Sequence, residues 1–189
     1  MPPVNSAEIV RPIALIGFMG VGKTTVGRRL AKRMNLPFYD SDEEIEQASG
    51  RTVAGYFKDH GEKDFRAGEH RVIQRILDGT PLILSTGGGA FIPDNTRDTL
   101  KQNALTVWLK GDFETIMERV SRKNTRPLLR VANPRAKVKE LMDARYPIYA
   151  QAHITVTIKK GPHLRTVIAV EKAIKSFERQ NKNLEAHKK

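Results

Sequence analysis

Cysteine is absent from this sequence of 189 residues. Its absence excludes disulfide bonds, thiolate metal ligands and a cysteine nucleophile. Residues 1–11 also lack the basic segment, the apolar segment and the small-residue cleavage site that make up a secretory signal. We therefore expect a cytoplasmic protein.

Long apolar runs are missing as well. Apolar segments such as residues 13–16 have the length of a strand, far short of the roughly 18 residues that a membrane-spanning helix needs. The composition, with 39% hydrophobic and 29% charged residues, is that of an ordinary globular protein. Because domains typically contain about 100–200 residues, we expect one domain over residues 11–180, an N-terminal extension at 1–10 and a polar tail at 181–189.

Aromatic residues are scarce where positive charge is concentrated. The net charge is +12, and residues 119–145 hold nine basic against two acidic residues and no aromatic residue. Proteins that bind nucleic acids more often place aromatic residues for base stacking among such basic residues. The pattern therefore fits a phosphorylated small molecule at least as well as nucleic acid, and a nucleic-acid-binding or switch nucleotide hydrolase is the alternative.

Short apolar runs alternate with amphipathic stretches, which is the pattern of successive βαβ units around a parallel sheet. The sequence therefore predicts an α/β fold. Ser41 and Glu44 are expected to form a capping box at the start of one helix, and Pro147 to end another. Residues 180–189 are expected to fray. The predicted strands are 12–16, 37–40, 82–86, 105–109 and 154–158, and the predicted helices are 23–34, 41–50, 52–58, 62–78, 95–102, 112–122, 135–145 and 164–179.

The segment GFMGVGKT at residues 17–24 matches the pattern G-x-x-x-x-G-K-[ST] and lies between a predicted strand and a predicted helix. Backbone N–H groups of such a loop, together with the start of the helix, form a cradle for a polyphosphate. We expect Lys23 to reach the β- and γ-phosphates of a nucleoside triphosphate and Thr24 to hold Mg²⁺. The residues expected to bind the nucleotide here are Gly20, Val21, Gly22, Lys23, Thr24 and Thr25.

Two carboxylates, Asp40 and Asp42, lie at the end of the second predicted strand, at the edge where open α/β sheets bind ligands. One is suited to complete the Mg²⁺ shell with Thr24, and the other to accept a hydrogen bond from an acceptor hydroxyl. The alternative is that both only stabilise the start of a helix, by ~0.3–1 kcal/mol each. Their place beside the phosphate loop favours the functional interpretation.

Two further features are candidates for binding the acceptor. The turn Gly87–Gly89 follows an apolar strand and exposes its backbone, although a plain turn would use the same residues. Arg66 has Glu69 three residues further on, so the carboxylate can orient the guanidinium toward an acceptor carboxylate. An exposed salt bridge of little energetic value is the alternative for this pair.

The arginine-rich segment at about 123–136 is predicted to be a mobile lid that excludes water and brings an arginine to the transferred phosphoryl group. The alternative is a solvated basic face. The histidines at 60, 70, 153, 163 and 187 show no metal-ligand spacing and are assigned structural roles.

These motifs together resemble the shikimate kinase family over residues 13–158. The D-x-D, F-R-x-x-E, triple-glycine and R-P-L-L motifs are more specific to that family than the phosphate loop. The segments that carry the resemblance are GFMGVGKTTVGRRLA at 17–31, YDSD at 39–42, YFKDHGEKDFRAGE at 56–69, LSTGGGAF at 84–91, TRPLL at 125–129 and ARYPIYAQA at 144–152.

The resemblance implies a P-loop αβα sandwich like that of nucleoside monophosphate kinases, with a five-stranded parallel sheet. It implies an acceptor-binding region at about 41–70 and the lid at about 123–136. The implied reaction transfers the γ-phosphate of ATP to the 3-hydroxyl of shikimate in aromatic amino-acid biosynthesis, with Mg²⁺ as cofactor. We expect a monomer that acts on these two small molecules and binds neither nucleic acid nor membranes.

By position, the resemblance also implies a role for each site residue. Lys23, Asp42 and Arg126 are the catalytic residues, and Thr24 and Asp40 are the Mg²⁺ ligands. Arg122 flanks adenine, and Arg126 of the lid reaches the phosphoryl group. The residues implied to bind shikimate are Asp42, Arg66, Gly87, Gly88, Gly89 and Arg145, with the two arginines on its carboxylate. A related metabolite kinase, such as a gluconate kinase, would share the nucleotide cradle but not this acceptor set.

Overall fold

The computed structural model describes residues 11–121 and 131–186. Arg122 and most of the predicted lid, including Arg126, lie outside the described residues, as do the two ends of the chain. None of the helices in the described ranges combines the length and the hydrophobicity of a membrane span. The elements in chain order are β1 (Ile13–Ile16), α1 (Lys23–Met34), β2 (Phe38–Asp40), α2 (Ser41–Ser49), α3 (Val53–Ile76), β3 (Ile83–Ser85), α4 (Asp94–Asn103), β4 (Leu105–Lys110), α5 (Phe113–Ser121), α6 (Pro134–Tyr149), β5 (Ile154–Thr157) and α7 (His163–Ala186).

The five strands form one parallel sheet in the order β2-β3-β1-β4-β5. β1 lies at its centre, and all four of its residues are buried. From β1 the chain crosses to β2 on one side of the sheet, and from β3 it crosses to β4 on the other side of β1. The direction of winding therefore reverses between the neighbouring strands β1 and β3. Ligands of open α/β sheets bind in the crevice at such a switch point. Here the phosphate loop and the triple-glycine turn flank it.

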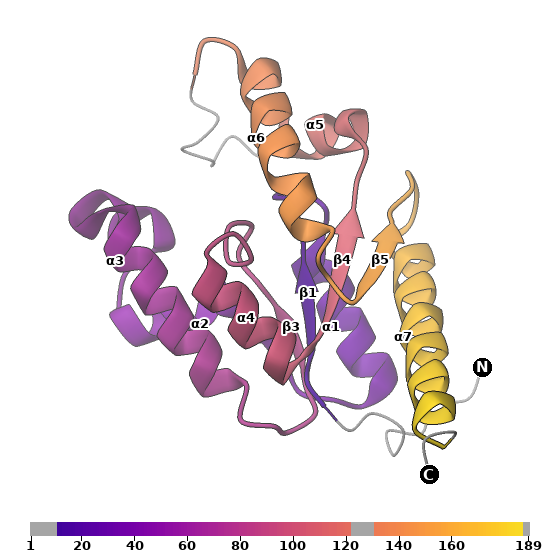
Figure 1. Ribbon diagram of the computed structural model, residues 1–189. Helices are drawn as coiled ribbons and strands as arrows, with labels where there is room; N and C mark the ends of the chain where they lie inside the picture. The colour runs from indigo at the N-terminus through magenta and orange to yellow at the C-terminus, as the bar shows by residue number, and fades with distance from the viewer. Residues whose placement is uncertain (1–10, 122–130, 187–189) are drawn as a thin grey trace.

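Helices cover the sheet as a βαβ succession requires. α1 contacts α7, and α7 packs on β5, whereas α4 packs between α3 and β4. Figure 1 shows α5 and α6 beyond the carboxyl ends of the central strands and the α2–α3 pair to one side of the sheet. The predicted α/β fold with five parallel strands is confirmed.

The predicted capping box at the start of α2 is wrong. Asp40 is the N-cap, and its Oδ1 accepts a hydrogen bond from the N–H of Asp42 at 3.1 Å. Ser41 is already the first helical residue, and its Oγ accepts a hydrogen bond from the N–H of Gly87 at 2.9 Å. Glu44 instead pairs with Arg75 of α3. The helix therefore starts directly at the end of β2, and Ser41 ties it to the triple-glycine turn.

Two predicted helix ends are also wrong. α6 continues through Pro147 to Tyr149. The proline costs the helix one backbone hydrogen bond, and the hydroxyl groups of two tyrosines hold the last turn in place. The hydroxyl of Tyr146 donates to the carbonyl of Gly111, and that of Tyr149 to the carbonyl of Gly88. α7 continues to Ala186, so the expectation of fraying fails for residues 180–186.

His153 is a structural histidine, as its sequence context indicated, and it makes stability depend on pH. The N–H of Thr106 donates to its Nδ1 at 3.1 Å, which requires the neutral ring. Burial, with Arg11 and Lys101 nearby, lowers the pKa of His153 below 6.5. The unfolded chain therefore binds this proton more readily, and stability is lost as the pH falls from about 6.5 through the folded-state pKa.

We expect this loss to stay below about 1 kcal/mol, because water screens the partly exposed ring. Urea unfolding of the wild type and of His153→Gln at pH 7.5 and 5.5 would measure it. The wild type should lose more stability between the two pH values than the variant. An equal loss in both proteins would contradict the assignment.

Candidate functional site

The phosphate loop joins β1 to α1 through three glycines with positive φ, Gly17, Gly20 and Gly22. A Cβ on Gly17 would lie 2.7 Å from the carbonyl oxygen of Leu109, so the loop can leave the sheet only with glycine at this position. Gly22 has φ 94° and caps α1 without a side-chain hydrogen bond. The first N–H groups of a helix have no intrahelical acceptor. Those of α1 therefore face the loop, as in a polyphosphate cradle.

A cavity of about 580 Å³ opens above this loop. It is lined by Asp40 and Asp42 of the β2–α2 junction and by Gly88 of the turn after β3. Both carboxylates therefore line a cavity at the edge of the sheet where the sequence predicted a ligand. The phosphate-loop and α1 residues that line the cavity are Met19, Gly20, Gly22, Lys23, Thr24 and Thr25.

Lys23 is buried and folds back over the loop. Its Nζ donates to the carbonyl oxygens of Gly17 and Phe18 at 2.8 and 3.1 Å. The ammonium group is thereby held at the floor of the cavity.

Thr24 and Asp40 meet beside the lysine. The hydroxyl of Thr24 donates to Asp40 Oδ2 at 2.8 Å and lies 3.5 Å from the hydroxyl of Ser85. Asp40 therefore caps α2 through Oδ1 and accepts the hydrogen bond of Thr24 through Oδ2. Hydroxyl and carboxylate oxygens are the ligands that Mg²⁺ prefers.

Asp42 has an unusual electrostatic environment. Burial raises its pKa, and the nearby carboxylate of Asp40 raises it further, whereas Lys23 and Arg66 act in the opposite direction. A carboxylate whose charged form is disfavoured is better able to take up a proton at neutral pH. Asp42 therefore has the position and the environment of a group that can accept a proton from a bound hydroxyl.

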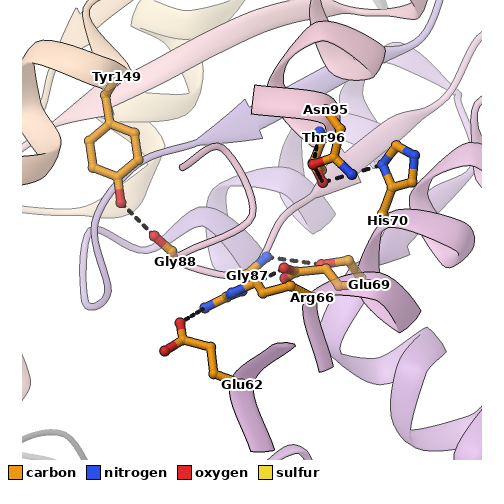
Figure 2. A network of polar contacts seen from close by, with 10 residues as sticks. Glu62, Arg66, Glu69, His70, Gly87, Gly88, Asn95, Thr96 and Tyr149 are labelled. Carbon is orange, nitrogen blue, oxygen red and sulfur yellow. Dashed lines mark hydrogen bonds and ion pairs between the residues drawn. The ribbon is translucent and has the colours of Figure 1, made fainter. Parts of the chain in front are cut away.

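Arg66 is oriented by Glu69, as the sequence spacing indicated. Its Nη1 donates to Glu69 Oε2 at 2.5 Å, and the side chain of Glu69 is only 1% exposed, so the pair is not an exposed salt bridge. Figure 2 shows the guanidinium beside Gly87, between Glu69 and Glu62. A methyl group on Gly87 would lie 2.7 Å from Asp42 Oδ1 and 2.8 Å from Glu69 Oε1. Asp42, Glu69 and Arg66 thus converge on the triple-glycine turn.

Tyr149 is a member of the site that the sequence reasoning missed. Its hydroxyl donates to the carbonyl of Gly88 at 2.5 Å, as Figure 2 shows. Burial raises the pKa of Tyr149 to about 12, while Arg145 and Arg66 favour its ionised form. The guanidiniums of Arg145 and Arg66 therefore both act electrostatically on this tyrosine. The segment ARYPIYAQA contains Tyr149, but a tyrosine at helical spacing carries no signal of such a contact.

The opposite end of the cavity is formed by Arg119, Lys160, Gly161 and His163. Arg119 Nη1 donates to the carbonyl oxygen of Val21 at 2.9 Å and so fixes the loop. Lys160 pairs with Glu118 at 3.3 Å. Arg122, which the resemblance assigned to adenine, lies outside the described residues, and Arg119 is the described arginine of α5 that lines the cavity.

Comparison with known proteins identifies the family. The family model described as shikimate kinase matches residues 19–175. A shikimate kinase of Bradyrhizobium diazoefficiens is 49% identical over 164 residues, which is 87% of this chain and 79% of that protein. The solved shikimate kinase of Acinetobacter baumannii in complex with shikimate has a TM-score of 0.85 at 38% identity, covering 89% of this chain and 95% of that chain. The shikimate kinase structure from Aquifex aeolicus has a TM-score of 0.75 at 32% identity, covering 87% and 96%. The chain belongs to the shikimate kinase family.

Proposed function

We propose that this chain is an ATP-dependent kinase that transfers the γ-phosphate of ATP to the 3-hydroxyl of shikimate, giving shikimate 3-phosphate and ADP. Its membership in the shikimate kinase family supports this function. The observation that carries it at the level of the site is that Asp42 lies against Gly87 and Arg66 against Gly89, in one turn beside the phosphate loop. A carboxylate that accepts from hydroxyls and a guanidinium that pairs with a carboxylate suit a hydroxylated acid.

In this proposal, Arg66 and Arg145 bind the carboxylate of shikimate, and the turn Gly87–Gly89 supports the ring. Asp42 accepts a hydrogen bond from the reacting hydroxyl and takes up its proton as the phosphoryl group is transferred. Lys23 holds the β- and γ-phosphates, and Gly20, Val21, Gly22, Thr24 and Thr25 complete the cradle. Arg126 of the lid at 123–136 remains a prediction for the phosphoryl group, outside the described residues.

The oxygen cluster of Thr24 and Asp40 fits Mg²⁺. Among the described residues there is no group of three or more histidine, aspartate or glutamate side chains that could bind a metal by themselves. Mg²⁺ at a nucleotide usually takes one or two protein oxygens and completes its shell with phosphates and water. Thr24 Oγ1 and Asp40 would hold the ion, which neutralises charge on the phosphates when bound.

We place the adenine end of the nucleotide at Arg119 and Lys160. Both line the cavity at the end away from Asp42, and Arg119 is fixed by its bond to Val21. A planar guanidinium stacks well on an aromatic base. Arg122, assigned to adenine from the resemblance, stays a prediction.

The remaining assignments of the sequence analysis also stand as proposals. They are a single kinase domain at 11–180 with an acceptor-binding region at about 41–70, action as a monomer, a cytoplasmic location, and no nucleic-acid or membrane partner. The concentration of positive charge in the sequence at 119–145, which includes the predicted lid, supports a small-molecule enzyme.

The decisive experiment measures ADP production from ATP and Mg²⁺ with shikimate, quinate or gluconate as acceptor. We expect strong stimulation by shikimate. Stimulation by gluconate alone would replace the proposed acceptor, and salt-sensitive binding of DNA or RNA without shikimate-dependent ADP release would support the nucleic-acid alternative.

Gly89→Ala is expected to raise the KM for shikimate about tenfold and to leave the KM for ATP near that of the wild type. A methyl group at this position would lie 2.3 Å from Arg66 Nη2 and 2.8 Å from Arg66 Cζ. The guanidinium is the far end of a flexible side chain, so it moves away while the fold is kept, and a charged hydrogen bond worth ~1.5–3 kcal/mol is weakened. Steady-state kinetics measure the change. Gly68→Ala is the matched control, because its methyl group would meet no atom closer than 3.7 Å. Equal kinetics in the two variants would contradict the role of Arg66.

A further inference from the structure

The side chain of Tyr149 joins α6 to the triple-glycine turn. It belongs to the last turn of α6 and is fully buried, and its ring centroid lies 6.0 Å from that of Trp108. Its hydroxyl donates to the carbonyl oxygen of Gly88 at 2.5 Å (Figure 2). Phenylalanine would fill the same space, so the hydroxyl adds a polar contact that the packing of the ring does not need.

The turn needs such a contact, because its residues have no side chains of their own to hold it. A Cβ on Gly87 would lie 2.7 Å from Asp42 Oδ1, and one on Gly89 would overlap the guanidinium of Arg66. Glycine is therefore required here, and its backbone is the least restricted of all residues. Because a peptide group is planar and trans, its carbonyl and its N–H point in opposite directions. The bond that holds the Gly88 carbonyl toward α6 therefore also sets the direction of the Gly89 N–H.

The same hydroxyl contacts Arg145, which lies one helical turn earlier on α6. Burial raises the pKa of Tyr149 to about 12, and Arg145 opposes this effect through its charge and a side-chain hydrogen bond. The hydroxyl therefore stays protonated at neutral pH. Since a hydroxyl has one donor and two acceptor positions, it can donate to Gly88 and accept from Arg145 at the same time. One buried oxygen thus connects the turn after β3 with a guanidinium of α6.

We propose that Tyr149 is a positioning residue for the acceptor, whose hydroxyl holds the Gly88 peptide and the guanidinium of Arg145 in the arrangement that binds shikimate. The inference rests on the proposed function, because Gly88 and Arg145 are assigned to the acceptor in that proposal. Tyr149 acts through these two groups rather than on the reacting atoms. It therefore affects the affinity for the acceptor and leaves nucleotide binding and the chemical step unchanged.

Kinetics of Tyr149→Phe test the proposal. We expect the KM for shikimate to rise about three- to tenfold, the size of one hydrogen bond, while kcat and the KM for ATP change by less than about twofold. An unchanged KM for shikimate would overturn the proposal, as would a parallel loss in all three kinetic constants.

Tyr146→Phe is the matched control for a loss of stability alone. Tyr146 lies on the same helix, its ring also packs on Trp108, and its hydroxyl donates to the carbonyl of Gly111, which is not among the cavity-lining residues. Each variant loses one hydrogen bond to a glycine carbonyl, so urea unfolding should show similar losses of stability. Only Tyr149→Phe should raise the KM for shikimate, and an equal rise in Tyr146→Phe would overturn the proposal.

A double-mutant cycle with Arg145→Ala separates the two contacts of the hydroxyl. Tyr149→Phe should raise the KM for shikimate less in Arg145→Ala than in the wild type, because the guanidinium that it orients is already missing. A smaller rise should remain, because the contact with Gly88 is still lost. An equal rise in both backgrounds would overturn the role of Arg145, and no rise in Arg145→Ala would overturn that of Gly88.

Hydrogen exchange followed by NMR tests the turn without any substrate. The N–H of Gly87 donates to Ser41 Oγ at 2.9 Å, and the N–H of Ala90 donates to the carbonyl of Gly87 at 3.2 Å. Both amides should exchange faster in Tyr149→Phe than in the wild type or in Tyr146→Phe, because the turn opens more often. Unchanged exchange in Tyr149→Phe would overturn the proposal. A wild-type protein that releases no ADP with shikimate would instead refute the proposed function, and the exchange rates would still decide whether Tyr149 holds the turn.

Discussion

Lys23→Ala is expected to reduce turnover at least about 10³-fold with any acceptor. In the folded chain, the buried Nζ is already fixed at the floor of the cavity by two carbonyl oxygens of the loop. Such a preorganised positive charge stabilises the charge that develops on the transferred phosphoryl group without further rearrangement. Its loss removes this stabilisation from every reaction that uses the same nucleotide.

The measurement is kcat for ADP release at saturating ATP and shikimate, together with ATP binding by calorimetry. Lys32→Ala on the same helix is the matched control, because Lys32 is exposed on the last turn of α1. Lys23→Ala also leaves the carbonyls of Gly17 and Phe18 without this donor, at a cost of ~1–3 kcal/mol. Thermal unfolding must therefore show that the variant is folded at the assay temperature. A folded Lys23→Ala enzyme with turnover near that of the wild type would contradict the mechanism.

The parts of the site that are local in sequence could be predicted. The phosphate loop is a continuous segment whose conformation follows from its own glycines, and the predicted helix at 23–34 coincides with α1. Arg66 and Glu69 lie on one turn of one helix, so their spacing was sufficient to predict the pair. Asp40 and Asp42 line the cavity because they lie at the carboxyl end of β2, which the sequence predicted at 37–40.

The parts that were missed depend on contacts between distant segments. Arg119 bonds to Val21 across 98 residues, and Tyr149 bonds to Gly88 across 61 residues. Neither residue lies in a motif that indicates the contact. The end of α6 was missed for the same reason, since tyrosine contacts outside the helix outweigh the local effect of Pro147. At the start of α2, the adjacent residues Asp40 and Ser41 are both of types that cap helices. The hydroxyl of Ser41 accepts the N–H of the distant Gly87 instead, and Asp40 is the cap.

Arg66→Ala is the second change with a large expected effect. We expect the KM for shikimate to rise about 10- to 100-fold, because a charged hydrogen bond is worth ~1.5–3 kcal/mol. The KM for ATP should change little, since Arg66 is not among the residues that line the nucleotide end of the cavity. Steady-state kinetics with each substrate varied in turn give both values. A KM for shikimate near that of the wild type would refute the assignment of Arg66 to the acceptor.

The same substitution removes the partner of a buried carboxylate, and this second effect can be separated from the first. Glu69 is buried, its Oε1 has no hydrogen-bond partner among the described residues, and burial raises its pKa above 4.5 while Arg66 lowers it. Without Arg66 the pKa rises further, so the folded state binds a proton that the unfolded state releases, and stability falls as the pH rises from about 4.5 through the folded-state pKa. Leaving one member of a buried ion pair unpaired costs roughly 3–5 kcal/mol at neutral pH.

Urea unfolding at pH 5 and pH 8 should show that Arg66→Ala is least stable at pH 8. Arg66→Ala combined with Glu69→Gln should recover stability at pH 8 but not the affinity for shikimate, because the amide removes the buried charge without restoring the guanidinium.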